Sequence, residues 1–410
     1  MKVYKIISNL IPRKKWRHQF RDYYKRRNIL KEININYQRH LSHLRQKSRI
    51  KVAFLVWENS KWSYDKIYQK LKTDNTFVPI VCLIKDTKFL CPFDQNKDFF
   101  KKKNYDYCII NNRTDLEKLK PDIVFYEQPW PVLGNELNPR HVSRFALCLY
   151  APYNIELGPS NTIFSKTKPF YQRVYQTFVF NKVVQQNIAK YGVTNTICSG
   201  HPKLDAYADP ISSKSIWKTH NKMRIIFAPH HSFRHTLQKW ATYEWSGQPL
   251  LQLAHKYAKE TEWIFKPHAR LYLEMSNEFG KEYADTVFDQ WAEISHLYDR
   301  GDYFDLFKTA DLMISDCSSF KIEWLPTGKP YIHLVSNYPD ADPEPPLKSY
   351  FMKGYYWAHN PKELDDYFHQ LVLRKQDPLK PVRQNLIKEI PLNASDFIVN
   401  YVKRLSKDQK

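Results

Sequence analysis

The amino-acid sequence predicts an α/β protein with two domains in tandem, each built on a parallel sheet, preceded by a basic helical arm. A chain of 410 residues is long enough for two or three domains. Short apolar runs alternate with polar, helix-periodic stretches, and this rhythm starts twice. The first 51 residues hold 16 Lys and Arg but only two acids, a net charge of +14. We therefore expect the arm at residues 1–48, Rossmann-like domains at 49–205 and 206–377 that face each other across a cleft, and a closing helix within 378–410.

Each expected strand is a short apolar run, rich in β-branched and aromatic residues, between turn-forming residues. These runs lie at residues 51–57, 78–84, 107–110, 123–126, 146–150 and 177–180, and again at 224–228, 263–266, 311–315 and 331–335. Polar periodic stretches indicate helices at residues 63–72, 114–119, 250–259, 303–309, 319–325 and 395–405. Strands separated by helices pair in parallel, with helices on both faces of the sheet.

The arm has the pattern of an amphipathic helix with aromatic anchors. Trp16, Phe20, Tyr23 and Tyr24 recur at helical spacing among Arg and Lys. A helix of this kind suits the surface of an anionic bilayer. The alternatives are a helix packed on the next domain with a solvated basic face, and a contact with nucleic acid.

No stretch approaches 18 apolar residues, and the apolar run at 6–11 is too short for a signal peptide, so we expect neither a membrane span nor a leader. The six cysteines show no C-x-x-C spacing, which favours reduced thiols. Together these features indicate a cytoplasmic protein, peripheral on the inner face of the cell membrane.

The chain has only nine glycines, and they form neither a G-x-G-x-x-G fingerprint nor a P-loop. Any nucleotide must therefore be held without a glycine-rich loop.

The stretch 311–323 is the strongest candidate for such a site. A buried strand runs into a polar turn, and a helix begins at the serines. Backbone N–H groups at a helix start form an anion site, to which Ser318 and Ser319 add hydroxyl donors. Asp316 in the turn and Glu323 one helical turn further are candidate nucleotide contacts. Simple N-capping by Ser or Asp is the alternative.

A second candidate follows the strand at 263–266. Lys266, His268 and Arg270 alternate, so all three would point to one side if the chain stayed extended. Three donors at the carboxyl end of a strand suit a pyrophosphate, and His268 could also pass a proton to a leaving phosphate. A solvated basic turn is the alternative.

The strand at 224–228 is also followed by histidines, His230, His231 and His235. We expect His230 and His231 to contact donor phosphates. A structural role and a metal site are the alternatives, but no H-E-x-x-H spacing or nearby Cys or Asp supports a metal. His201 lies where the two domains should meet, as a nucleotide contact or a hinge residue.

In the first half, Glu127, Tyr153 and Glu156 follow strands, where they could grip an acceptor. Glu127 and Glu156 are the candidate bases. The D-x-D motif at 340–342 lies in a proline-rich loop, and we do not expect it to bind a metal.

These motifs, in this order, resemble the CDP-glycerol glycerophosphotransferase family of bacterial teichoic-acid and capsule synthesis. Four blocks carry the resemblance: residues 200–205 (GHPKLD), 225–229 (IIFAP), 266–268 (KPH) and 310–330 (ADLMISDCSSFKIEWLPTGKP).

The resemblance implies a fold of the glycosyltransferase-B (GT-B) superfamily, with the donor held mainly by the C-terminal domain. It places donor phosphates at His268, Ser318 and Ser319, and the nucleotide near Glu323. Family members often carry a histidine–glycine pair in the N-terminal half as the acceptor-activating base. Here residues 152–154 read Pro-Tyr-Asn.

We therefore expect a transferase that moves glycerophosphate from CDP-glycerol, or a sugar from a UDP- or CMP-sugar, to a hydroxyl of a polysaccharide or lipid-linked acceptor. No cofactor besides the donor, and no metal, is expected. Two rivals from other classes are a nucleic-acid-binding protein that uses the arm and a non-catalytic scaffold for capsule assembly.

Overall fold

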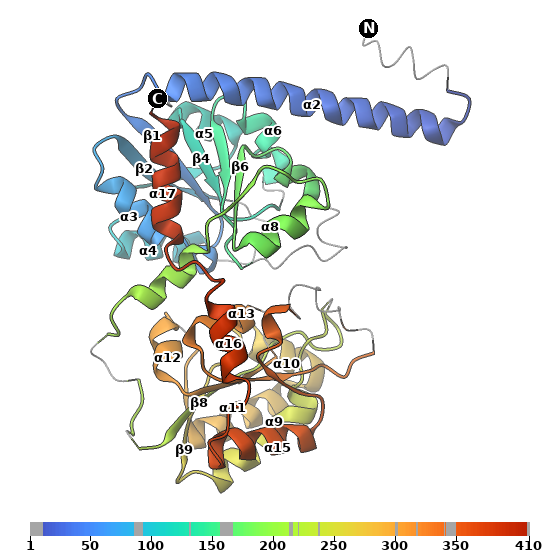
Figure 1. Ribbon diagram of the computed structural model, residues 1–410, viewed down its shortest axis with the longest axis vertical. Coiled ribbons are helices and arrows are strands. Elements are labelled where there is room, and N and C mark those ends of the chain that lie inside the picture. Colours follow the sequence, from blue (N-terminus) through green and yellow to red (C-terminus); the bar gives the residue numbers. More distant parts are fainter. Residues whose placement is uncertain are drawn as a thin grey trace. The chain divides into compact units, whose positions relative to one another are not determined.

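The computed structural model describes residues 11–85, 93–130, 133–155, 167–212, 216–219, 221–236, 238–299, 302–316, 319–339, 341 and 350–407. The chain divides into two compact units (Figure 1). The first contains the chain up to Lys203 together with the C-terminal segment from Asn393. The second is Leu204–Leu392.

The first unit is a seven-stranded parallel sheet in the order β3-β2-β1-β4-β5-β6-β7. Its strands are β1 (Ile50–Val56), β2 (Phe77–Ile84), β3 (Tyr107–Ile110), β4 (Ile123–Tyr126), β5 (Leu147–Tyr150), β6 (Gln176–Val179) and β7 (Thr196–Cys198). Every residue of β4 and β5 is buried, as expected for the middle of a parallel sheet covered on both faces. Its described helices are α2 (Lys14–Leu44), α3 (Asp65–Lys72), α4 (Phe93–Lys102), α5 (Arg113–Leu119), α6 (Pro139–Val142), α8 (Lys182–Ala189) and α17 (Ala394–Leu405).

Helix α2 has two halves with different surroundings. Its C-terminal half buries five residues spaced by three or four: Ile29, Ile33, Tyr37, Leu41 and Leu44. The Tyr37 hydroxyl donates to the carbonyl oxygen of Arg173 at 2.6 Å, which ties this half to the first unit. The N-terminal half, residues 14–28, buries no residue and extends past the sheet (Figure 1).

The C-terminal helix α17 also belongs to the first unit, because it packs against α3. Lys403 pairs with Asp74, and Asp396 pairs with Lys70, each at 2.8 Å. The sequence suggested one closing segment from residue 378, but residues 378–392 stay with the second unit.

The second unit is a six-stranded parallel sheet in the order β10-β9-β8-β11-β12-β13. Its strands are β8 (Met223–Ala228), β9 (Thr261–Phe265), β10 (Ser295–Leu297), β11 (Leu312–Ser315), β12 (Tyr331–Leu334) and β13 (Tyr356–Ala358). Its described α-helices are α9 (Tyr243–Lys256), α10 (Leu271–Phe279), α11 (Lys281–Ile294), α12 (Phe304–Thr309), α13 (Phe320–Glu323), α15 (Pro361–Phe368) and α16 (Lys380–Ile387). Phe265 stacks on Trp291 with ring centroids 5.2 Å apart, at the centre of a core that joins α11 to β8 and β9.

The predicted fold class, two parallel α/β units with an N-terminal helix, is confirmed. All ten predicted strands are present, whereas β7, β10 and β13 were not predicted. Each of these three has only three residues, too few to show a period. No helix in the described part of the chain combines the length and apolar character needed to cross a membrane.

Candidate functional site

The carboxyl ends of β8, β9 and β11 meet at one edge of the second sheet. Phe227 pairs with Phe265, and Ala228 pairs with Ser315, so the three strands end level with one another. The loops that follow them therefore leave the sheet side by side. Open α/β sheets bind ligands at this edge.

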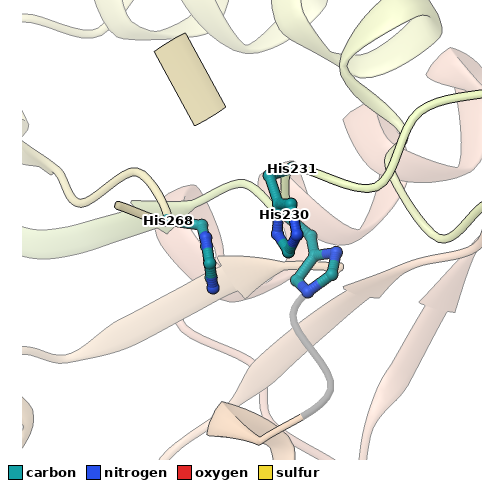
Figure 2. Close-up of side chains that lie close together, drawn as sticks. All are labelled: His230, His231 and His268. Atoms are coloured by element: carbon teal, nitrogen blue, oxygen red, sulfur yellow. The ribbon is translucent and has the colours of Figure 1, made fainter. Parts of the chain in front are cut away.

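Three of the predicted residues, His230, His231 and His268, gather at this edge (Figure 2). The rings of His231 and His268 stack with centroids 4.0 Å apart and planes 22° apart. His230 lies 5.2 Å from His268, centroid to centroid. One ring nitrogen from each histidine lies within 4.8 Å of the others. The structure thus brings together histidines that follow two different strands.

Backbone hydrogen bonds fix where two of these imidazoles carry their proton. Nδ1 of His268 accepts the N–H of Arg270 at 3.1 Å, and Nδ1 of His230 accepts the N–H of Ser232 at 3.3 Å. Because an accepting nitrogen carries no proton, each neutral ring holds its proton on Nε2. For His268, no acceptor for this Nε2–H exists among the described residues.

Burial keeps two of the three rings neutral. It is the main reason why the pKa of His268 falls to about 3 and that of His231 to about 4, with positive neighbours such as Arg270 adding to the effect. Nδ1 of His231 is buried and has no hydrogen-bond partner in the described part of the chain.

The cluster of three histidines also raises the question of whether it could bind a metal ion. Three imidazoles match the ligand count of catalytic zinc sites, but a ligand nitrogen must offer a lone pair. In His230 and His268 the lone pair lies on Nδ1 and is already engaged, so Nε2 is a donor. The described arrangement therefore fits an anion better than a metal cation.

Lys266 and Arg270 do not continue the extended pattern, because β9 ends at Phe265 and α10 begins at Leu271. The ammonium of Lys266 is buried 5.0 to 5.5 Å from the ring centroids of three aromatic residues, Tyr298, Tyr303 and Phe320. The exposed guanidinium of Arg270 pairs with Glu274. Both cations remain close enough to His268 to lower its pKa.

Asp316 fastens the loop that follows β8. Its carboxylate accepts hydrogen bonds from the N–H of His230 at 2.6 Å, and from the N–H and hydroxyl of Thr242 at 2.7 and 2.9 Å. The residue is 1% exposed, and burial raises its pKa. Asp316 therefore joins the two ends of the loop, which we call its neck.

The helix after β11 is shorter than the sequence predicts. Helix α13 is a single turn, followed by a 3-10 turn at Leu325–Thr327. Pro326 explains the break, because proline cannot donate the next helical hydrogen bond. Ser319 directly precedes this turn, whereas Ser318 lies outside the described residues. Glu323 is buried, and its carboxylate accepts from the Tyr303 hydroxyl at 2.5 Å.

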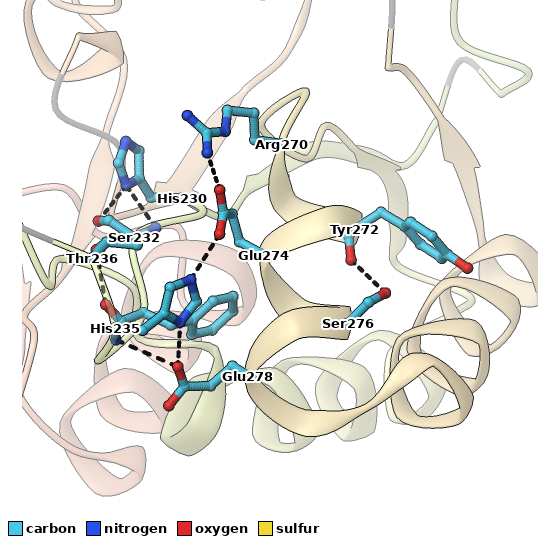
Figure 3. A network of polar contacts seen from close by, with 10 residues as sticks. His230, Ser232, His235, Thr236, Arg270, Tyr272, Glu274, Ser276 and Glu278 are labelled. Carbon is cyan, nitrogen blue, oxygen red and sulfur yellow. Dashed lines mark hydrogen bonds and ion pairs between the residues drawn. The ribbon is translucent and has the colours of Figure 1, made fainter. Parts of the chain in front are cut away.

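A second polar network, not foreseen from the sequence, holds the same loop farther from its neck (Figure 3). Both ring nitrogens of His235 contact carboxylates of α10: Nε2 lies 2.7 Å from Glu274, and Nδ1 bonds Glu278. The sequence singled out His235 only as a possible metal ligand. The sequence does contain a signal for this network. Glu274 and Glu278 are four residues apart, so they lie on one face of a helix and favour a cation between them.

Among the candidates of the first unit, Glu127 lies at the carboxyl end of β4. It is 1% exposed, and one of its oxygens accepts the N–H of Trp57 at 3.0 Å. The other oxygen, Oε2, has no hydrogen-bond partner among the described residues. Burial raises the pKa of Glu127 to about 8, so this carboxyl is mostly protonated at neutral pH. Glu156, the other candidate base, lies outside the described residues.

His201 ties two loops of the first unit together. Its Nε2 donates to the carbonyl oxygen of Pro152 at 2.9 Å, and its Nδ1 accepts the N–H of Lys203 at 3.2 Å. Burial lowers the pKa of His201 to about 3. With both nitrogens engaged, the ring has no nitrogen left for a hydrogen bond to a nucleotide in this arrangement.

No protein-family model and no curated protein sequence matches this chain. Solved structures do. MnaA of S. aureus in complex with UDP is 11% identical with a TM-score of 0.60, and the match covers 86% of this chain and 96% of that chain. The UDP-GlcNAc 2-epimerase of Neisseria meningitidis bound to UDP-GlcNAc is 13% identical with a TM-score of 0.58, covering 87% and 100%.

The wall teichoic acid polymerase TagF is 12% identical with a TM-score of 0.59, and the match covers 98% of both chains. These neighbours are enzymes of the GT-B superfamily. At such low identity the likeness establishes the fold alone, and this chain has the GT-B fold.

Proposed function

We propose that the protein is a transferase of bacterial surface-polymer synthesis that takes its group from a nucleotide-activated donor. The observation that carries this proposal is the Nε2–H of His268 at the ligand-binding edge of the second sheet: its tautomer is fixed, and no described residue accepts this proton. The ammonium of Lys266 and the guanidinium of Arg270 add positive charge beside it. The phosphate groups of such a donor need this combination of hydrogen-bond donors and charge.

Two versions of the reaction share this requirement. In the first, an acceptor hydroxyl attacks the β-phosphorus of CDP-glycerol, the bond to the bridging oxygen breaks, and CMP leaves. In the second, the hydroxyl attacks the anomeric carbon of a nucleotide sugar, and the nucleotide leaves. In both, negative charge grows on the departing phosphate, and donors placed in advance stabilise it.

The proposed contacts follow from this chemistry. His268, with His231 stacked beside it and His230 next to it, would face the diphosphate. Ser318 and Ser319 after β11 would complete the phosphate site. Glu323 remains our candidate for a contact with the nucleoside of the donor. Its carboxylate accepts from Tyr303, one of the aromatic residues around Lys266. Asp316 acts through the loop that it closes.

We propose that these histidines work without a metal. Zinc bound at Nε2 of His230 or His268 would first have to displace the proton, and Nδ1 could not take it because it already accepts a backbone N–H. Chelators should therefore leave binding of the nucleotide unchanged.

For the acceptor hydroxyl, Glu127 and Glu156 remain the candidate bases. A base of pKa about 8 is mostly protonated at neutral pH, so a reaction that depends on Glu127 would speed up as the pH rises toward that value.

The N-terminal half of α2 supports association with the inner membrane surface, where a lipid-linked acceptor would lie. Residues 13–28 hold eight Lys and Arg and one acid. Trp16 is 54% exposed and Tyr23 is 60% exposed. Basic side chains with exposed aromatics match an anionic lipid surface. We do not expect nucleic acid to be the physiological partner.

One difference among the neighbours favours a polymerase-like reaction. The match to TagF covers 98% of this chain and so must extend into α2, whereas the matches to MnaA and to the UDP-GlcNAc 2-epimerase cover 86–87% of it. CDP-glycerol is therefore our first choice of donor, and a UDP- or CMP-sugar is the second.

A donor screen tests the proposal. The protein, with membranes as a source of acceptor, is incubated with CDP-glycerol, CDP-ribitol, CMP-sugars and UDP-sugars, and the released nucleotide is identified. CMP from a CDP-alcohol supports the glycerophosphate version, and UDP or CMP from a sugar donor supports the glycosyl version. A UDP-sugar that is epimerised but not consumed, or silence with every donor, would contradict the proposal.

A further inference from the structure

The loop between β8 and α9 (residues 229–242, described except residue 237) carries two histidines of the proposed phosphate site. Asp316 closes its neck through His230 and Thr242. Inside the loop, the N–H of Trp240 donates to the hydroxyl of Ser232 at 3.0 Å. The part between Ser232 and Trp240 has a separate attachment to α10, through His235 (Figure 3).

The attachment through His235 has a definite proton requirement. Its two ring nitrogens contact two different carboxylates, those of Glu274 and Glu278. A carboxylate can only accept, and a neutral imidazole has only one N–H to donate. Both contacts can be hydrogen bonds together only when the ring is protonated.

We infer that protonated His235 latches the β8–α9 loop onto helix α10 and so positions His231 beside His268, which makes binding of the donor diphosphate dependent on pH. His235 is then a positioning residue that need not touch the donor. This inference rests on the proposed function, because it concerns the regulation of the same site.

The charges around His235 are compatible with this role. On α10, the Glu274 and Glu278 carboxylates face the ring, and Arg270 also pairs with Glu274. The loop itself adds His231 and Arg234, and α9 contributes Glu244, which lies 3.7 Å from Arg234. The hydrogen bonds to Glu274 and then Glu278 raise the pKa of His235.

The raised pKa of His235 determines in which pH range the latch holds. A histidine with a raised pKa in the folded protein is fully protonated below its ordinary pKa of 6.5, and it loses its proton as the pH rises through the raised value. The latch therefore holds below pH 6.5 and weakens as the pH rises through the raised pKa of His235. His231 and His268, with pKa values of about 4 and 3, stay neutral throughout and do not contribute.

The test is calorimetric binding of CDP and of UDP from mildly acid to mildly alkaline pH. In the natural protein, affinity should fall above the pKa of His235 by at most about tenfold for each pH unit. His235→Gln should bind more weakly at acid pH and lose this fall. Titration of the ligand's own phosphate is common to both proteins and cancels in the comparison. His359→Gln is the matched control, because this exposed histidine also contacts a carboxylate, that of Glu363, but lies at the start of α15.

A second variant separates protonation from simple loss of a contact. In Glu278→Gln, a neutral His235 can donate from Nε2 to Glu274 and accept the glutamine amide at Nδ1. The latch should then persist at alkaline pH, and the affinity should stay high where the natural protein has lost it. A natural protein and a His235→Gln variant with the same pH profile would overturn the inference.

Hydrogen exchange distinguishes this failure from failure of the proposed function. At one alkaline pH, peptides of the loop should exchange more slowly in Glu278→Gln than in the natural protein, with or without nucleotide. If neither CDP nor UDP binds at any pH, the proposed function fails, and the exchange result alone decides whether the latch exists. Equal exchange in the two proteins would refute the latch.

Discussion

Three histidines of this chain each accept the same kind of local hydrogen bond at Nδ1. They differ in the partner of the other ring nitrogen, Nε2. In His201, His230 and His268, Nδ1 accepts the N–H of the residue two positions on. Each neutral ring therefore carries its proton on Nε2. His201 donates that proton to a buried carbonyl, that of Pro152, and so acts as a structural tie. His268 has no such acceptor among the described residues, which leaves its donor for a ligand.

Replacement of His268 tests this assignment. His268→Ala should lower turnover by about 10²–10³, the usual effect of removing one donor from a developing negative charge. His268→Gln should recover part of the loss, because its amide can still donate. Turnover is measured as nucleotide release, and circular dichroism of each variant checks the fold. Near-normal turnover in well-folded His268→Ala would contradict the assignment.

Glu127 offers a test that does not need a substrate. Because burial raises its pKa from 4.5 to about 8, the folded protein binds more protons than the unfolded chain between these values, and the free energy of unfolding falls as the pH rises through that window. Glu127→Gln keeps an acceptor for the Trp57 N–H and cannot ionise. It should resist denaturant better than the natural protein at neutral and alkaline pH, with the gain vanishing below pH 4.5.

Denaturation midpoints measured across the pH range check this expectation. A constant difference between the two proteins at every pH would show that the carboxyl does not titrate as proposed.

At the scale of elements, strands were easier to predict than the site. Long buried strands such as β1 and β2 can be predicted from their apolar composition. The three-residue strands β7 and β13 are too short for such a pattern and are defined by their pairing with neighbouring strands. The sequence placed His230, His231 and His268 after the correct strands, because position at a strand end is a local property. It could not show that Asp316 closes a loop, since that depends on partners 74 and 86 residues away.

We expect the two halves of helix α2 to have different roles: the N-terminal half binds the membrane, and the C-terminal half stabilises the fold. Reversing the charge of Lys25, Arg26 and Arg27 to Glu should weaken binding to vesicles that contain anionic lipid, because each basic residue near such a surface contributes about 1 kcal/mol. Unfolding should be nearly unchanged, since this half is exposed. Ile33→Ala should do the opposite and lower the free energy of unfolding by about 2–5 kcal/mol, because Ile33 is buried against the first unit.

Vesicle co-sedimentation at low and high salt, and denaturant unfolding, measure the two effects. If the charge reversal leaves vesicle binding intact, the membrane role of the arm is wrong.

At the scale of the whole molecule, the first unit is built from two segments that lie far apart in the sequence. Helix α17 completes the first unit, although nearly 190 residues of the second unit separate it from β7. Ile398 on α17 is fully buried, whereas the side chain of Asp396, two residues earlier, is 59% exposed in its ion pair with Lys70.

Ile398→Ala should therefore destabilise the first unit by about 2–5 kcal/mol. Asp396→Asn is the matched control on the same helix and should change stability by less than about 1 kcal/mol, the usual contribution of an exposed pair. Hydrogen exchange can locate the effect: peptides of β1 and α3 should exchange faster in Ile398→Ala, while those of β8 and β9 keep their protection. An equal loss in both sheets would mean that the C-terminal helix supports the two units jointly, contrary to the division seen here.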